Sequence, residues 1–218
     1  MSRRVAVLAA VALVALGVLY AGRGQWLPLA RRVRALVPRP VRYHSHEAVR
    51  RPFGPGGAPW PIPGVIESED YDLGTAADPA YGDTTPGSQA PADQRYRDDD
   101  VDIGVDHVLG LADLAWVEAG EWVEYTVVAS SPGGFTVTVR LATPLAGRRF
   151  CILLDGVDVT GPVVSPTTGC WGSDLQGHHC FGEVTTRSFR VASGVHRVRF
   201  VATTGGYTVD RLAFAQAD

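Results

Sequence analysis

The sequence contains no lysine, so all 20 of its Lys/Arg side chains are arginine, and its formal net charge is only −3. This balance gives the chain as a whole no electrostatic reason to bind nucleic acid. The sequence also lacks a Gly-x-Ser-x-Gly nucleophile motif, a glycine-rich phosphate loop and a His-Glu-x-x-His zinc motif. Its carboxylates are abundant, but no spacing singles out a glycosidase pair. We therefore do not expect an enzyme.

Long apolar runs are also scarce, and the clearest covers residues 5–21, directly after Arg3 and Arg4. A run of this length is at the lower limit for a membrane-spanning helix and long for a signal-peptide core. Residues 1–22 are therefore predicted to form a short hydrophobic helix that is either a signal-anchor or a cleaved signal peptide. No obvious cleavage site follows the run, which favours a retained anchor and makes the membrane a partner of this segment.

Residues 23–61 are rich in Pro, Gly and Arg, a composition that cannot build a hydrophobic core. Ten of the 20 arginines lie within the first 60 residues, together with a single acidic residue, Glu47, so the remainder of the chain is acidic. This segment is predicted to be a disordered linker between the N-terminal helix and a folded domain at residues 62–218.

The folded domain shows short runs of alternating polar and apolar residues, separated by Gly, Pro, Asp and Ser. Such runs predict short β-strands with one solvated face, and many of them at regular spacing indicate a β-sandwich or barrel. The expected strands cover residues 122–128, 135–141, 149–154, 188–191, 196–201 and 207–214. The fold class is therefore all-β, with two antiparallel sheets and no helix in the domain.

Three carboxylates suggest a metal site in this domain. If residues 67–71 form a strand, Glu67 and Glu69 lie on the same face, about 7 Å apart. Asp210 would join them if the first and last strands are neighbours. Oxygen ligands of this kind suit Ca²⁺. The alternative is a solvated acidic strand without metal.

The tryptophans differ in their surroundings. Trp122 lies in an alternating run and is expected in the core, whereas Trp116 and Trp171 lie in polar, glycine-containing segments. A large aromatic side chain in such a loop is typical of ligand sites, because its face offers apolar area to a flat ligand such as a sugar ring.

The chain has three cysteines, so one thiol remains if two of them pair. Cys170 and Cys180 enclose a nine-residue loop that is easily closed, and we expect them to form a disulfide that leaves Cys151 free. The same loop contains His178 and His179, but the spacing does not match the usual zinc motifs.

An ordered set of segments resembles carbohydrate-binding module family 6, an all-β jelly-roll family. The matching segments are residues 62–71, 81–87, 96–103, 116–127, 154–156, 168–171 and 205–210. They occur in family order and span nearly all of residues 62–216. The resemblance implies a structural Ca²⁺ held by Glu67, Glu69 and Asp210. It also implies a sugar site in the loops at one edge of the sandwich, with Trp116 and Trp171 against the sugar ring.

The sequence departs from the family pattern at three places. Thr208, next to Tyr207, stands where the family has an asparagine that binds the sugar, and Gly104 stands where many members have a glutamate. The loop at Trp171 carries an insertion that runs to Cys180. The predicted sugar-binding set is therefore Trp116, Trp171, Tyr207 and Thr208.

The leading hypothesis is non-catalytic binding of a polysaccharide or oligosaccharide. The alternative is a structural or adhesion domain of the cell envelope that contacts a protein and has a degenerate sugar site. The domain is expected to be monomeric and extracytoplasmic, either anchored to the membrane or secreted. The arginines that follow the apolar run oppose this location, since they predict an inward-facing domain, but the disulfide and the sugar chemistry favour the outside.

Overall fold

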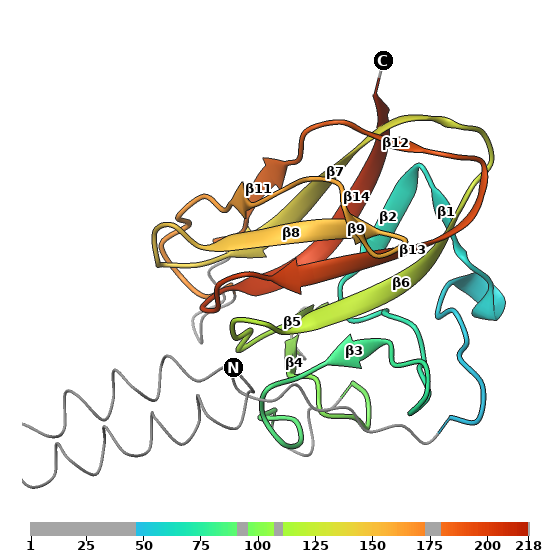
Figure 1. Cartoon of the computed structure of the whole chain (residues 1–218). Coiled ribbons are helices and arrows are strands. Elements are labelled where there is room, and N and C mark those ends of the chain that lie inside the picture. Colours follow the sequence, from blue (N-terminus) through green and yellow to red (C-terminus); the bar gives the residue numbers. More distant parts are fainter. Residues whose placement is uncertain (1–46, 91–95, 107–110, 173–179, 218) are drawn as a thin grey trace, which may run out of the picture. The chain divides into compact units, whose positions relative to one another are not determined.

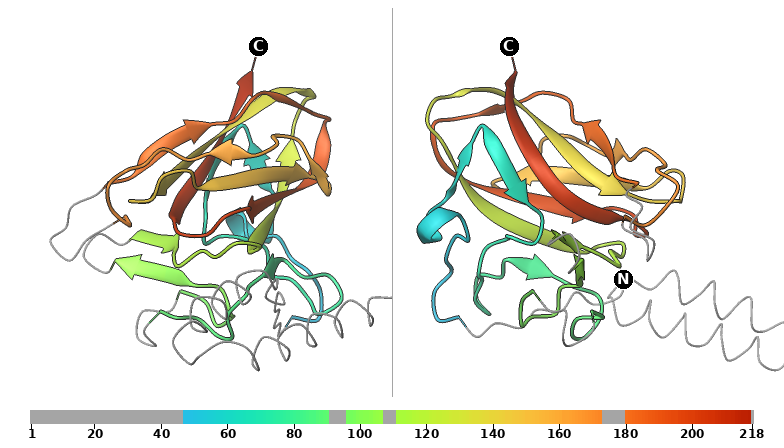
Figure 2. Two further views of the ribbon diagram at one scale, coloured as in Figure 1. Left: turned by 60° about the vertical axis from the view of Figure 1, so that its left-hand side comes forward. Right: turned by 180° about the vertical axis from the view of Figure 1, so that it is seen from behind.

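The computed structural model describes residues 47–90, 96–106, 111–172 and 180–217, which form a β-sandwich of two seven-stranded sheets (Figure 1). The first sheet has the order β1-β6-β13-β8-β10, with β3 paired to β6 and β9 paired to β8. The second has the order β11-β7-β14-β5-β4, with β12 paired to β7 and β2 paired to β14. Figure 2 shows these two layers from two further directions. The all-β sandwich prediction is confirmed, while the expected N-terminal helix lies outside the described residues.

The strands of the first sheet are β1 (Trp60–Ile62), β3 (Tyr81–Gly82), β6 (Trp122–Ala129), β8 (Arg149–Leu154), β9 (Val157–Asp158), β10 (Val163–Val164) and β13 (Gly194–Ala202). Those of the second are β2 (Gly64–Glu67), β4 (Ile103–Asp106), β5 (Leu111–Leu114), β7 (Gly133–Ala142), β11 (Gly182–Thr185), β12 (Phe189–Val191) and β14 (Thr208–Ala217). A single 3-10 turn, Pro55–Gly57, precedes β1.

The core lies between the two sheets and follows from the period-two alternation of the strands. In β7, Phe135, Val137, Val139 and Leu141 point inward and are at most 1% exposed, whereas the residues between them face outward or are partly exposed. The first sheet contributes aromatic side chains, including a stacked Phe150–Phe200 pair. This continuous apolar layer fixes the ends of the strands, and thereby the positions of the loops that connect them.

Two features of the strands differ from expectation. The sheets are not wholly antiparallel, because β1 pairs with β6 in parallel. In addition, β2 ends at Glu67, so Glu69 lies in the turn that follows the strand. Glu67 and Glu69 therefore do not share one strand face, as the sequence had suggested.

The packed domain begins earlier than the predicted boundary at residue 62. The backbones of Arg51 and Leu73 exchange two hydrogen bonds of 2.9 Å, and Trp60 and Pro61 of β1 pair with Val127 and Val128 of β6. The part of the predicted linker that the structure describes, residues 47–61, is thus integrated into the sandwich. The rest of that linker lies outside the described residues.

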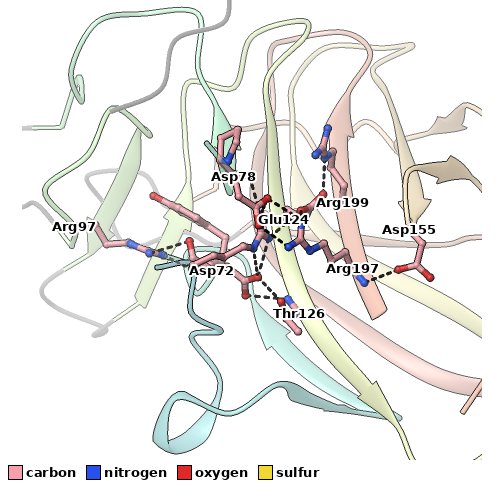
Figure 3. A network of polar contacts seen from close by, with 11 residues as sticks. Asp72, Asp78, Arg97, Glu124, Thr126, Asp155, Arg197 and Arg199 are labelled. Atoms are coloured by element: carbon pink, nitrogen blue, oxygen red, sulfur yellow. Dashed lines mark hydrogen bonds and ion pairs between the residues drawn. The ribbon is translucent and has the colours of Figure 1, made fainter. Parts of the chain in front are cut away.

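A buried ion-pair network around Asp72 and Glu124 (Figure 3) ties this N-terminal segment to the sandwich through Arg50. One terminal nitrogen of Arg50 lies 2.8 Å from Asp72 and 2.9 Å from Glu124, and the exposed fractions of the three side chains are 8%, 0% and 5%. Glu124 also forms an ion pair with Arg199, at 2.8 Å. Burial in such a network is tolerable only because each charge has a partner.

In the described part of the chain, no helix is both long and apolar enough to span a membrane. The predicted signal-anchor at residues 1–22 lies outside the described residues.

Candidate functional site

Trp116 lies in the loop between β5 and β6 and is 50% exposed. Its φ angle is 48°, which places a bulky non-glycine residue in the left-handed region. This conformation is unfavourable for such a residue and persists only where the surrounding structure enforces it, as at ligand sites. The loop thus keeps a tryptophan face at the surface at an energetic cost.

A chain of hydrogen bonds joins the Trp116 loop to three other loops at the same end of the sandwich. The Gly206 amide donates to the Val117 carbonyl at 2.8 Å, and the Thr143 hydroxyl donates to the Gly206 carbonyl at 2.7 Å. The Thr168 amide donates to the Thr143 carbonyl at 2.7 Å. The loops after β5, after β7, before β11 and before β14 therefore form one connected edge.

Trp171 stands on this edge, three residues after Thr168, and is 52% exposed. It is flanked by Cys170, which forms the predicted disulfide with Cys180, and by Gly172 at φ 120°. A β-carbon at Gly172 would lie 3.1 Å from the ring of Phe181, and the φ angle is one that other residues rarely adopt, so this position favours glycine. The disulfide and this contact fix the backbone on both sides of the tryptophan.

The disulfide has a further consequence for the zinc alternative. The sulfur atoms of Cys170 and Cys180 are bonded to each other and are not free to ligate a metal. His178 and His179 lie outside the described residues. Cys151, expected to be free, is a buried free thiol in β8, and burial raises its pKa.

The structure does not place Tyr207 and Thr208 on the surface of this edge. Tyr207 is 1% exposed, packs edge-on against Phe200 and directs its hydroxyl to the Arg149 carbonyl at 3.4 Å; burial raises its pKa. Thr208 is 5% exposed at the first position of β14, paired with Ala142. The sandwich therefore buries both side chains and leaves little of either accessible to a sugar.

Trp122 also differs from expectation. It lies on the outer face of β6 rather than in the core, is partly exposed, and carries the Arg199 guanidinium 3.7 Å from its ring centre. Residues Val123, Tyr125 and Val127 of the same strand point inward. The sequence correctly predicted that side chains alternate between the two faces of this strand, but Trp122 lies on the solvent face and not on the core face.

Acidic side chains that the sequence did not single out brace the Trp116 loop. Glu121 accepts hydrogen bonds from the backbone amides of Glu118 at 2.7 Å and Thr84 at 3.2 Å. Burial raises the pKa of Glu121, and burial together with Glu121 raises that of Asp83 to about 7. Gly104, the family departure, lies beneath this loop, and a β-carbon there would come within 2.9 Å of Asp113 and 3.4 Å of Ala115. The sequence alone could not show these roles, because the contacts join residues that are far apart in the chain.

The predicted metal ligands lie near one another but have different surroundings. Asp210 is 3% exposed and forms an ion pair with Arg140 at 2.6 Å. Burial raises the pKa of Glu67, and the neighbouring Asp210 raises it further. Burial also raises the pKa of Glu69 to about 8, and one of its carboxylate oxygens is buried without a hydrogen-bond partner.

These observations allow a test of whether the residues fit a cation. The partnerless oxygen of Glu69 and its nearby carboxylates would be stabilised by a positive ion, which favours a metal. Arg140 already neutralises Asp210. Within the described ranges, no group of three or more His, Cys, Asp or Glu side chains is arranged to hold a metal ion. The three predicted ligands therefore do not form a complete cation site in this arrangement, and the partnerless oxygen of Glu69 is the one feature that favours a cation.

A β-sandwich with exposed aromatic side chains on a connected loop edge is the arrangement expected of a carbohydrate-binding module. Comparison with known proteins supports this class. The model of a carbohydrate binding module of family 35 matches residues 97–213, more than half of the chain. The protein belongs to this family. The prediction of a carbohydrate-binding module is thus confirmed, and the family model that matches is that of family 35.

Solved family 6 modules share the fold. One from Clostridium stercorarium, solved with cellobiose, has a TM-score of 0.52 at 19% identity and covers 74% of this chain and 99% of its own. A β-1,3-glucan-binding module from Bacillus halodurans has a TM-score of 0.50 at 20% identity, covering 73% of this chain and 100% of its own.

A curated relative, the exo-β-D-glucosaminidase of Amycolatopsis orientalis, is 30% identical over 158 residues. The match covers 67% of this chain but only 14% of the glucosaminidase. The two proteins therefore share one module.

Proposed function

We propose that this protein binds a polysaccharide or oligosaccharide without cleaving it, and that Trp116 and Trp171 contact the sugar ring. The observation that carries the proposal is the exposure of these two indoles, 50% and 52%, on loops joined by hydrogen bonds at one edge of the sandwich. Covering an exposed indole face with an apolar surface removes it from water and is favourable. The apolar face of a sugar ring is such a surface, and the backbone restraints on both loops reduce the entropy lost on binding.

The first experiment is a glycan array with the wild-type chain, followed by titration of the best ligand into Trp116→Ala and Trp171→Ala variants. Each substitution should weaken binding by at least about tenfold, since buried aromatic anchors each contribute about 1.4 kcal/mol or more. Val195→Ala is the matched control, because Val195 is an exposed apolar residue (62%) near the start of β13, whereas the loop edge lies beyond the end of that strand. Absence of binding to any plant, fungal or bacterial glycan would contradict the proposal.

The same samples test whether the chain is catalytic. The curated relative is named as an enzyme, but this chain matches only a small part of it, and we propose that the shared part serves binding. Incubation with the bound glycan should release no reducing sugar over time. Sustained release that scales with protein concentration would show that the domain is an enzyme.

A second candidate, a structural or adhesion domain of the cell envelope, is favoured by one observation. Tyr207 and Thr208 are buried, so the position of the family asparagine supplies no polar contact at the surface. In this case the Trp171 loop would contact a protein. Retention of a purified envelope protein on immobilised wild-type chain, lost with Trp171→Ala and accompanied by no glycan signal, would select this candidate.

We further propose that Glu67, Glu69 and Asp210 hold a structural Ca²⁺. The support is the buried, partnerless oxygen of Glu69 and the raised pKa values of Glu67 and Glu69, which a bound cation would lower again. A ligand that binds only the folded state raises its stability. EDTA should therefore lower the melting temperature and added CaCl₂ should restore it, and Glu69→Gln should abolish both effects. A melting curve unchanged by EDTA would exclude the metal.

The disulfide supports an extracytoplasmic location, because such bonds persist in oxidising compartments. We propose that the domain is monomeric and lies outside the cytoplasm, secreted or anchored through its N-terminal segment. A reporter fused after residue 218 that is active only outside the cell, together with fractionation of the membrane, tests location and anchoring.

A further inference from the structure

The loop between β7 and β8, residues 143–148, lies between the two loops that carry the tryptophans. On one side the Thr143 carbonyl accepts the Thr168 amide, three residues before Trp171. On the other side the Thr143 hydroxyl donates to Gly206, whose own amide donates to Val117, the neighbour of Trp116. This loop therefore connects the Trp116 side of the edge to the Trp171 side.

Two side chains of this loop, Leu145 and Arg148, lie against Gly206. A β-carbon at Gly206 would come within 3.0 Å of the Leu145 Cδ1 atom and 3.7 Å of the Arg148 Cδ atom. Leu145 is 41% exposed and Arg148 is partly exposed. The two side chains thus add an apolar and a cationic group to the edge that presents the tryptophans.

The guanidinium of Arg148 has unused hydrogen-bonding capacity. It donates to two backbone carbonyls, from Nη1 to Gly205 at 3.2 Å and from Nε to Ala146 at 3.3 Å. Among the described residues, Arg148 has no carboxylate partner, in contrast to Arg50, Arg140 and Arg199. A guanidinium has five N–H donors, so three of them are left for a ligand or for water. The two carbonyl contacts hold the side chain in place without neutralising it.

Among the described residues, the position expected to bind the sugar offers no exposed polar side chain. The chain contains no asparagine, and Thr208, at the position expected to bind the sugar, is buried. Tryptophan faces alone select poorly among sugars, because hydrogen bonds to hydroxyls determine orientation and specificity. An oriented donor on the same loop edge would supply that selection.

We propose that Arg148 is a specificity-determining residue that donates hydrogen bonds to oxygen atoms of the bound sugar. The inference rests on the proposed function of the same edge and adds its polar partner. The acceptors are hydroxyl or carboxylate oxygens, which share this chemistry.

The test is calorimetric titration of wild-type chain, Arg148→Ala, Arg148→Lys and Arg149→Ala. The probes are the strongest neutral glycan and the strongest uronic-acid-containing glycan from the array. Arg148→Ala should weaken binding by about 10- to 100-fold, the loss expected for hydrogen bonds from a charged donor. Arg148→Lys should fall between, since it keeps the charge but not the planar fork. Arg149→Ala is the matched control, because that neighbouring side chain is exposed and lies in β8.

The two probes distinguish the acceptors. If the acceptor is a carboxylate, the uronic-acid glycan binds more tightly and its affinity falls as NaCl is raised. If the acceptor is a hydroxyl, Arg148→Ala weakens binding of the neutral glycan as well, and the affinity depends little on salt. An Arg148→Ala variant with wild-type affinity, alongside Trp116→Ala with lost affinity, would overturn the role of Arg148 and leave the sugar site intact. Failure of the wild-type chain to bind any glycan would overturn the proposed function and this inference with it.

Discussion

Arg50 offers a sharp test of the fold, because the sequence placed it in a linker and the structure places it in a buried ion-pair network. Its guanidinium lies 2.8 Å from Asp72 and 2.9 Å from Glu124, and all three side chains are at most 8% exposed. Replacing Arg50 by alanine leaves two buried carboxylates with one counter-ion fewer. Removal of one partner from a buried pair costs about 3–5 kcal/mol.

The remaining contacts place Arg50→Ala near the lower end of that range. Glu124 keeps Arg199 at 2.8 Å, and Asp72 keeps the backbone amide of Thr126 at 2.9 Å. We therefore expect a loss of about 3 kcal/mol in the free energy of unfolding. For a domain of this size, that corresponds to a decrease of about 6–12 °C in melting temperature.

Differential scanning calorimetry of the purified chain measures this change, and Arg51→Ala is the control. Arg51 is the adjacent arginine, but its side chain is 58% exposed and pairs with Glu47 at the surface. Such a pair is worth at most about 1 kcal/mol. Equal melting temperatures for Arg50→Ala and Arg51→Ala would refute the view that residues 47–61 are an integral part of the sandwich.

Two further predictions concern pH and redox state. Burial raises the pKa of Glu69 to about 8 in the folded state, so the folded protein favours the neutral side chain below this pH. In EDTA, the contribution of Glu69 to stability should therefore be complete below about pH 4.5 and be lost as the pH rises through 8. Glu69→Gln should remove this part of the pH dependence of the melting temperature. Reduction of the Cys170–Cys180 disulfide should weaken glycan binding through Trp171, whereas the far-UV circular dichroism spectrum should stay unchanged because the bond fixes a surface loop and no core strand. Equal affinity of the reduced and oxidised protein in a titration would show that the disulfide does not position Trp171.

The sequence predicted the parts of the fold that depend on local alternation. The expected strand at residues 149–154 coincides with β8, and β6, β7 and β13 were expected within a few residues of their ends. Short strands such as β1 and β4 were not predicted, since two to four residues carry too little periodicity to be distinguished from loops. The parallel pairing of β1 with β6 could not be predicted, because it depends on contacts between distant segments.

The candidate site was predictable only in part. Trp116 and Trp171 could be singled out because large aromatic residues in polar, glycine-containing loops have few structural explanations. The burial of Tyr207 and Thr208 depends on where β14 begins, and strand ends are poorly defined by sequence. Arg148 could not be recognised among 20 arginines, because its significance comes from its lack of a carboxylate partner among the described residues and from its place beside Gly206.

The central claim is that two tryptophans at one loop edge bind a sugar, and NMR of the indole N–H groups tests it most directly. The chain has five tryptophans, so each indole signal can be assigned by single substitution and followed while the glycan selected on the array is added. We predict that the signals of Trp116 and Trp171 shift in a saturable way, while those of Trp60 and Trp122 stay in place. Shifts confined to Trp60 or Trp122, or no shift at saturating glycan, would contradict the proposed site.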